Sequence, residues 1–154
     1  MKLRTLLCAS VLLAPPLAAG DYDALARTLR QAWPQCATVA LVCDTAASKA
    51  AIDTITGALS GLKVIVVDVK GQQDIGKAVA TLTGRRPDAV VLVAGDKVAG
   101  DGSSAAGFLI QRLGSAKIPA VATTEQAVRQ GAVFAVGPGT GGKVNWQHAE
   151  RLAD

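Results

Sequence analysis

The stretch Thr38-Val39-Ala40-Leu41-Val42-Cys43 decides the fold. It is a continuous apolar run, the pattern expected of a strand that is buried on both faces of a parallel sheet. A helical pattern over residues 46–59 follows it, and a second apolar run over residues 63–68 comes next. A strand, a helix and a second strand in this order predict a βαβ unit, in which the helix crosses the sheet between two parallel strands.

The same alternation extends over the chain on both sides of this unit. Upstream, Leu25, Leu29 and Trp33 lie four residues apart, which predicts a helix over residues 22–33 that ends at Pro34. Downstream, helices are predicted at 72–83, 102–113, 125–130 and 145–153, and strands at 89–93, 119–122 and 132–136. We therefore predict an α/β fold: a three-layer α-β-α sandwich with a five-stranded parallel sheet, Rossmann-like or flavodoxin-like, of strand order 2-1-3-4-5.

The first residues carry the pattern of an export signal. Met1-Lys2-Leu3-Arg4 is short and positive, and an apolar stretch and a run of small residues follow it. The apolar stretch is much shorter than the roughly 20 residues that a membrane-spanning helix needs, so no stable membrane insertion is expected. We predict a signal peptide over residues 1–20, cleaved after Gly20 or Ala19, one domain over residues 21–154, and a periplasmic or secreted location.

Charge and size narrow the range of partners. Cleavage leaves about 134 residues, the size of one domain with one core. The formal charge of the whole chain is +4, and half of it belongs to Lys2 and Arg4, which leaves +2 for the mature part. So small a charge gives no reason to expect nucleic acid or an anionic membrane as a partner.

Two cysteines, Cys36 and Cys43, remain in the mature part. An oxidising compartment permits a disulfide. The predicted strand between them nevertheless holds their Cα atoms farther apart than the limit of about 7 Å for a disulfide. We predict that Cys43 is a buried thiol and that Cys36 is either free or bridges two chains.

Small polar residues cluster where the predicted strands end. In an open parallel sheet, ligands bind outside the carboxyl ends of the strands, near the point where the strand order reverses. Asp44, Asp96 and Lys97 could hold the amine or the carboxylate of a zwitterion. The same residue types also form ordinary helix caps and turns, and Ser48, Asp101 and Thr123 or Thr124 are placed as caps. Both interpretations stay open for the candidate ligand-binding residues, which are Asp44, Thr45, Ser48, Asp96, Lys97, Thr123 and Thr124.

Patterns of catalysis are weak. The only histidine, His148, lies in the last predicted helix, no serine has the setting of a nucleophile elbow, and no His, Cys or carboxylate cluster has metal-ligand spacing. The glycine-rich segment 137–142 lacks the Gly-Lys-Ser/Thr ending of a phosphate loop and follows the last strand rather than the first. We interpret it as an exit from that strand, and we predict a protein that is not an enzyme and uses no cofactor.

Three pieces of sequence carry a family resemblance: Lys117-Ile118-Pro119-Ala120-Val121, then Glu125, then Val128-Arg129-Gln130-Gly131-Ala132-Val133-Phe134-Ala135-Val136-Gly137. In this order and spacing they resemble the second lobe of ABC-transporter substrate-binding proteins, in a subfamily that binds amino acids or similar small solutes. The upstream apolar runs agree, so the resemblance covers about residues 37–138. It implies a periplasmic-binding-protein-like lobe in which Asp44, Ser48, Asp96 and Thr123 face a ligand cleft.

The chain departs from that family in two respects. Members of the family close two lobes on the ligand, whereas this sequence shows one lobe, and residues 138–142 replace an acidic and aromatic segment. One lobe alone buries too little of a ligand for a good pocket. We predict non-catalytic binding of a small molecule such as an amino acid, by a dimer or by an accessory to an ABC transport system. The alternative is a periplasmic protein–protein interaction module that binds no small ligand, and an enzyme of receiver-like or flavodoxin-like shape ranks third.

Overall fold

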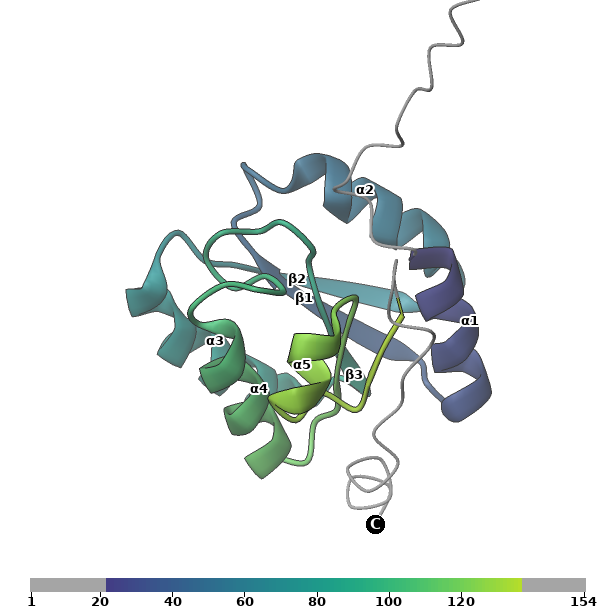
Figure 1. Cartoon of the computed structure of the whole chain (residues 1–154). Helices are drawn as coiled ribbons and strands as arrows, with labels where there is room; N and C mark the ends of the chain where they lie inside the picture. Colours follow the sequence, from purple (N-terminus) through teal and green to yellow (C-terminus); the bar gives the residue numbers. More distant parts are fainter. Residues whose placement is uncertain (1–21, 137–154) are drawn as a thin grey trace, which may run out of the picture.

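The computed structural model describes residues 22–136. The predicted signal peptide, the glycine-rich segment 137–142, the helix at 145–153 and His148 lie outside the described residues. Within the described range, helices and strands alternate along the chain (Figure 1). In order they are α1 (Tyr22–Ala32), β1 (Thr38–Cys43), α2 (Lys49–Ala58), β2 (Lys63–Asp68), the 3-10 turn η1 (Gln72–Asp74), α3 (Ile75–Arg85), β3 (Ala89–Leu92), α4 (Ala106–Ser115), β4 (Ala120–Ala122), α5 (Glu125–Arg129) and β5 (Phe134–Ala135).

The five strands form one parallel sheet of order β2-β1-β3-β4-β5. β1 lies between β2 and β3, and its Val39 pairs with Val64 of β2 and Ala89 of β3. This confirms the predicted fold class and strand order. The order reverses between β1 and β3, so the loops that follow these two strands meet at the carboxyl edge of the sheet.

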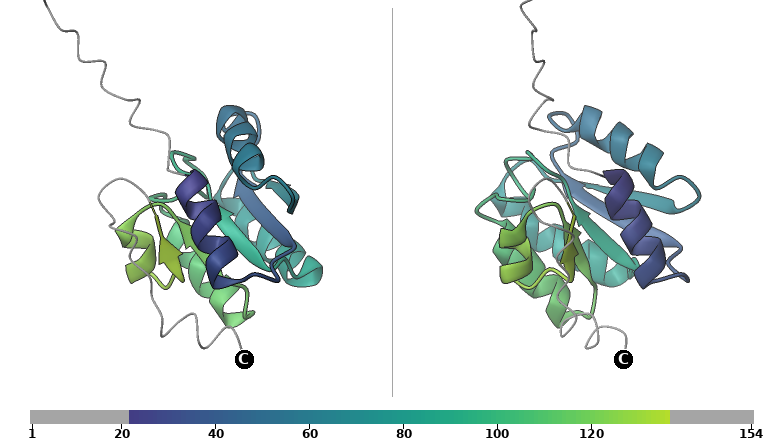
Figure 2. Two further views of the ribbon diagram at one scale, coloured as in Figure 1. Left: turned by 90° about the vertical axis from the view of Figure 1, so that its right-hand side faces the viewer. Right: turned by 45° about the vertical axis from the view of Figure 1, so that its right-hand side comes forward.

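The two faces of the sheet are covered by different helices (Figure 2). Ala40 and Val42 of β1 pack with apolar residues of α3 and α4 on one face. Val39 and Leu41 pack with apolar residues of α1 and α2 on the other. Because successive side chains of a strand point to opposite faces, a strand covered on both sides must be apolar throughout, as β1 is. Each residue from Val39 to Cys43 has no exposed surface.

Three helices begin later than their sequence patterns predicted: α3 begins at Ile75 after the 3-10 turn η1, rather than at residue 72, and the other two are α2 and α4. α2 begins at Lys49 rather than at residue 46, and α4 begins at Ala106 rather than at residue 102. At α2, the aspartate that follows β1 takes backbone N–H groups with which the predicted helix would begin. The loop before α4 also holds an aspartate, but the N–H groups that it takes lie ahead of residue 102. Asp44 accepts from Ala46 and Ala47. Asp96 does the same for the two N–H groups that follow Lys97.

The loop between β3 and α4 depends on one glycine. A Cβ atom at Gly100 would lie 2.3 Å from the carbonyl oxygen of Val93 and 2.5 Å from that of Asp96. Both obstructing atoms belong to the backbone, so they can move only if the loop moves. The close approach of these three residues therefore requires the absence of a side chain at position 100.

The two cysteines of the described range are free thiols. Cys43 is fully buried at the end of β1, which confirms the prediction of a buried thiol. Burial, with a smaller contribution from the nearby Asp96, raises the pKa of Cys43 to about 12, so this thiol stays protonated. Cys36 is half-buried.

Candidate functional site

Three loops bring polar side chains together at the carboxyl edge of the sheet. The loop after β1 carries Asp44 and Ser48, the loop after β3 carries Asp96 and Asp101, and the turn after β4 carries Thr123. Their strands are neighbours in the order β1-β3-β4. The predicted clustering of these loops is therefore present in the structure.

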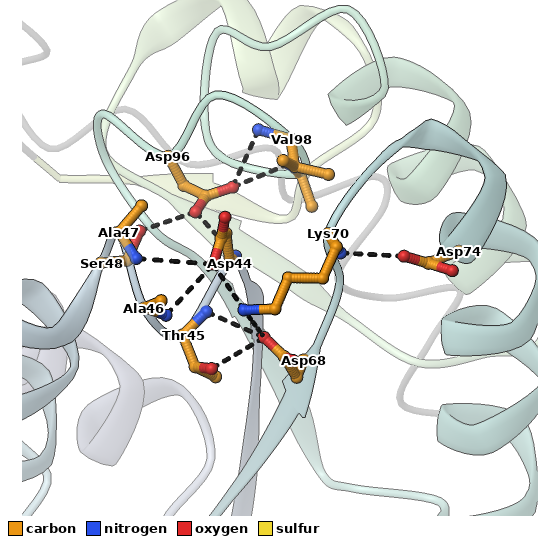
Figure 3. A network of polar contacts seen from close by, with 11 residues as sticks. Asp44, Thr45, Ala46, Ala47, Ser48, Asp68, Lys70, Asp74, Asp96 and Val98 are labelled. Carbon is orange, nitrogen blue, oxygen red and sulfur yellow. Dashed lines mark hydrogen bonds and ion pairs between the residues drawn. The ribbon is translucent and has the colours of Figure 1, made fainter.

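Asp96 occupies the centre of this edge (Figure 3). Its side chain is buried, with 4% of the residue exposed. One carboxylate oxygen accepts hydrogen bonds from the Asp44 N–H at 2.9 Å and the Ser48 hydroxyl at 2.6 Å. The other oxygen accepts from the Val98 and Ala99 N–H groups at 3.0 and 2.9 Å. Asp96 thus ties the loop after β1 to the loop after β3, and this internal use leaves it little capacity for a direct contact with a ligand.

A second carboxylate cluster lies beside Asp96 on the strand pair β1 and β2 (Figure 3). Lys70 Nζ lies 2.8 Å from Asp44 and 3.1 Å from Asp68. The N–H and the hydroxyl of Thr45 donate to Asp68 at 2.9 and 2.7 Å. One lysine bridges two carboxylates here, so the cluster keeps one net negative charge.

The ionisation of this cluster follows from its contacts. The hydrogen bond from Lys70 holds the pKa of Asp44 below its ordinary value. The N–H and hydroxyl of Thr45, followed by Lys70, lower the pKa of Asp68 to about 2. The two carboxylates in turn raise the pKa of Lys70. All three groups are therefore charged at neutral pH.

Asp101 stabilises the turn that precedes α5 through hydrogen bonds. Its carboxylate accepts from the N–H groups of Thr123 and Thr124 at 2.7 and 2.8 Å, and from the hydroxyl of Thr124 at 2.5 Å. Thr124 is also the N-cap of α5, because its hydroxyl oxygen accepts from the Ala127 N–H. The predicted capping role of Thr124 is confirmed.

The capping prediction for Asp101 is wrong, and the one for Ser48 is right only in position, since Ser48 is the N-cap residue of α2. Ser48 precedes α2 but makes no side-chain hydrogen bond to the helix, because its hydroxyl donates to Asp96 instead. Asp101 lies well before the first residue of α4 and binds the two threonines after β4. In both cases the side chain forms a hydrogen bond with a residue that follows another strand instead of capping the nearby helix, and the sequence pattern does not reveal that partner.

The candidate residues differ in how open they are. Ser48 and Thr123 are buried, with 8% and 6% of their surface exposed. Asp44, Thr45 and Thr124 are half-buried, whereas Lys97 is exposed and forms no ion pair within residues 22–136. Among these candidates the open groups are therefore the second oxygen of Asp44, the hydroxyl oxygen of Thr45 and the ammonium of Lys97. Their role in binding a ligand stays a prediction.

Lys70 and Asp68 were missed as site residues. Sequence reasoning took the loops after strands one, three, four and five and left out the loop after strand two. A signal was present, since Asp68-Val69-Lys70 follows an apolar run and the predicted order places that strand beside the first. Strand adjacency would have brought Lys70 next to Asp44.

The described residues limit the chemistry of the edge. Within residues 22–136, no three His, Cys, Asp or Glu side chains are arranged to hold a metal ion. No helix in the same range is long and apolar enough to cross a membrane. The edge offers the ammonium groups of Lys97 and Lys70, the carboxylates of Asp44 and Asp68, and hydroxyl groups, a set that suits a small polar molecule carrying both charges.

The fold and this edge define a doubly wound α/β lobe with a polar carboxyl rim. Neither the scan against protein-family models nor the search of curated proteins finds a match. Among solved structures, a conserved domain protein from Vibrio cholerae O1 biovar El Tor aligns with a TM-score of 0.63 at 17% identity, over 88% of this chain and 44% of that one. An ABC domain from Streptococcus pneumonia, in complex with L-Trp, aligns with a TM-score of 0.61 at 20% identity, over 86% of this chain and 42% of that one.

These alignments settle the kind of fold. The chain shares the doubly wound α/β fold of the matching part of these two structures. It spans less than half the length of either structure, while those structures cover most of this chain. The resemblance seen in the sequence is confirmed at the level of the fold.

Proposed function

We propose that the protein is an exported, non-catalytic binding protein of the solute-binding type. Its ligand is a small zwitterion such as an amino acid, held at the carboxyl edge of the sheet. The observation that carries the proposal is that this lobe fold occurs together with open groups of both charges at the carboxyl ends of β1 and β3, where the strand order reverses.

The fold supports this function because one structural neighbour is a complex with L-Trp. In an open parallel sheet, the crevice outside the carboxyl ends is the general place for a ligand. Export is supported by the signal-peptide pattern at residues 1–20.

The arrangement of the edge supports a division of labour among its residues. Asp96 and Asp101 fix the loops, because each carboxylate accepts backbone and hydroxyl hydrogen bonds from the loop after a neighbouring strand. Lys97 is the group that meets the ligand carboxylate, and Asp44 is the group that meets its amine. Asp44 keeps its charge for this task because Lys70 neutralises only one side of it.

The described lobe provides one wall of a cleft. A ligand site normally buries 70–90% of the surface of a small ligand, which requires more than the edge of a single lobe. We infer that the opposite wall comes from outside this lobe, from a second copy or from another exported protein. An accessory role in an ABC transport system is compatible with either source.

The test is a thermal-shift screen of the purified protein against amino acids, small carboxylates and nucleotides, with light scattering in the same buffers. A ligand present at about 100 times its Kd adds about 2.7 kcal/mol to the free energy of unfolding, a shift of several degrees. We expect one class of zwitterion to give such a shift, and calorimetry of that compound to give its Kd. A rise in mass on addition would identify a second copy as the opposite wall.

Matched variants show whether the binding is at the proposed edge. Lys97→Gln and Asp44→Asn should abolish the shift without lowering the melting temperature of the free protein by more than about 2 °C, because both side chains are at least partly exposed. Lys63→Gln, at the opposite end of β2, removes the same charge away from the edge and should leave the shift unchanged. No shift with any compound would favour the protein–protein interaction module instead.

A further inference from the structure

The amino-terminal edge of the sheet contains a cavity of about 480 Å³. It lies between the segment before β1, the α3–β3 turn and the α4–β4 turn, at the end of the molecule opposite the polar edge described above. Its volume lies within the range of about 300–1,000 Å³ typical of small-molecule sites. The proposed solute site makes no use of it.

Two cationic side chains line this cavity and have no partner in the described part of the chain. Arg86 follows α3 and Lys117 follows α4, and neither takes part in an ion pair or a side-chain hydrogen bond among residues 22–136. Both residues have positive φ angles, 46° and 58°. This left-handed conformation is unfavourable for residues other than glycine and asparagine, so a long cationic side chain at both turns needs an explanation.

The carboxylate at the cavity does not neutralise these cations. Asp88 also lines the cavity, but one of its oxygens accepts the N–H groups of Ala37 and Thr38 at 2.9 and 2.8 Å. Those contacts tie the α3–β3 turn to the start of β1. Two cations against one already engaged carboxylate leave the cavity with a net positive charge.

The apolar part of the lining is rigid. The Trp33 ring lines the cavity and stacks on Phe134, with ring centroids 6.0 Å apart and planes 22° apart. Phe134 is fully buried, so it holds the indole in place. Ile118 adds a buried aliphatic surface. An aromatic ring fixed beside unpaired cations suits a ligand that has a flat apolar part and an anionic group.

We propose that this amino-edge cavity is a second binding site, which takes a small aromatic carboxylate or phosphate. Arg86 and Lys117 bind the anionic group, and Trp33 and Ile118 contact the ring. Arg86 provides a planar pair of donors that matches carboxylate or phosphate oxygens.

The helix dipoles at this edge oppose the binding of an anion, but more weakly than Arg86 and Lys117 favour it. α1, α3 and α4 all end at this edge, and the C-terminus of a helix carries about half a negative elementary charge, which disfavours anions. The carbonyl groups at the ends of α3 and α4 already accept N–H groups from Arg86 and Lys117. The two side chains carry full charges at the cavity, so the cationic contribution dominates.

The test is a titration of the purified protein with phenyl phosphate, followed in amide proton–nitrogen NMR spectra. We expect saturable shifts at the amides around Trp33, Arg86 and Lys117, and none around Asp44 or Asp96. Benzamidine has the same ring with a cationic group and should bind at least about tenfold more weakly. Inorganic phosphate has no ring and should also bind more weakly.

Variants assign the binding to the two cations. The double variant Arg86→Asn with Lys117→Asn keeps residues that tolerate positive φ and should weaken phenyl phosphate binding at least about tenfold. Arg85→Gln, the neighbouring arginine that does not line the cavity, should leave it unchanged. If the double variant loses its native spectrum, the two single variants are compared in its place.

Alkylation of Cys36 gives an independent readout, because this half-buried thiol lines the cavity. Phenyl phosphate should slow its reaction with iodoacetamide, as followed by peptide mass mapping, while the buried Cys43 stays unmodified with or without the compound. The proposal is overturned by equal binding of benzamidine, by shifts at the carboxyl edge instead, or by unchanged affinity in the asparagine variants. A negative result for the amino-edge cavity would not count against the proposed solute site, since the two sites lie at opposite edges of the sheet.

Discussion

Replacing Asp96 by alanine should destabilise the protein far more than replacing an exposed aspartate. Its buried carboxylate accepts four hydrogen bonds, from the N–H groups of Asp44, Val98 and Ala99 and the hydroxyl of Ser48. A hydrogen bond to a charged group contributes about 1.5–3 kcal/mol, but donors at a loop recover some of this from water. We expect a loss of about 3–4 kcal/mol, or about 12–16 °C in melting temperature at about 4 °C per kcal/mol.

The assay is urea unfolding at pH 7, followed by far-UV circular dichroism and tryptophan fluorescence. Asp96→Asn keeps the shape but turns an NH₂ group toward two of the donors, so it should lose about half as much. Asp53→Ala removes an exposed carboxylate that pairs only with Lys49 and should change the free energy of unfolding by less than about 0.5 kcal/mol. A loss below about 1 kcal/mol for Asp96→Ala would refute the view that this carboxylate holds the two loops together.

Three further predictions follow from single contacts. The pKa of Asp68 is lowered to about 2 in the folded protein, so its contribution to stability is present above pH 4 and is lost as the pH falls from 4 to 2. In Asp68→Asn, the free energy of unfolding measured in urea should therefore depend less on pH between 4 and 2. Gly100→Ala would place a Cβ atom against backbone oxygens and should lower the free energy of unfolding by more than about 2 kcal/mol in the same urea assay. Gly76→Ala lies in α3 with open space around it and should raise the free energy of unfolding by about 0.5–1 kcal/mol. Arg86→Gly relieves a φ of 46° and should stabilise the fold by up to about 1 kcal/mol in thermal unfolding while it weakens phenyl phosphate binding. A destabilised variant would contradict the assignment of strain.

The sheet could be predicted because its signal is local. The runs 38–43 and 63–68 form strands with these same limits. A strand covered on both faces, such as β1, needs apolar residues along its length, whereas β2 lies at the edge of the sheet and is exposed at Lys63, Val66 and Asp68. Helix beginnings were predicted less well. At α2 the first N–H groups of the predicted helix are taken by Asp44, and the number of residues used in this way depends on the turn and not on helix propensity.

The location of the candidate site could be predicted from the sequence, but the roles of its residues could not. The rule that loops after parallel strands share one edge brought Asp44, Asp96 and Thr123 together. It does not say which of them face solvent. Asp96 is buried and saturated, and Lys97 beside it is exposed, although both were candidates of equal standing in the sequence.

The sequence by itself determined the fold class, the order of helices and strands, and the edge at which polar residues gather, because apolar periodicity and short connections allow few other arrangements. Only the tertiary structure decided which polar groups satisfy each other and which stay open. The bond from Ser48 to Asp96 joins residues 48 positions apart, and the amino-edge cavity is formed by three separate turns. Such contacts depend on how neighbouring strands align and how helices pack on them, which local sequence does not specify.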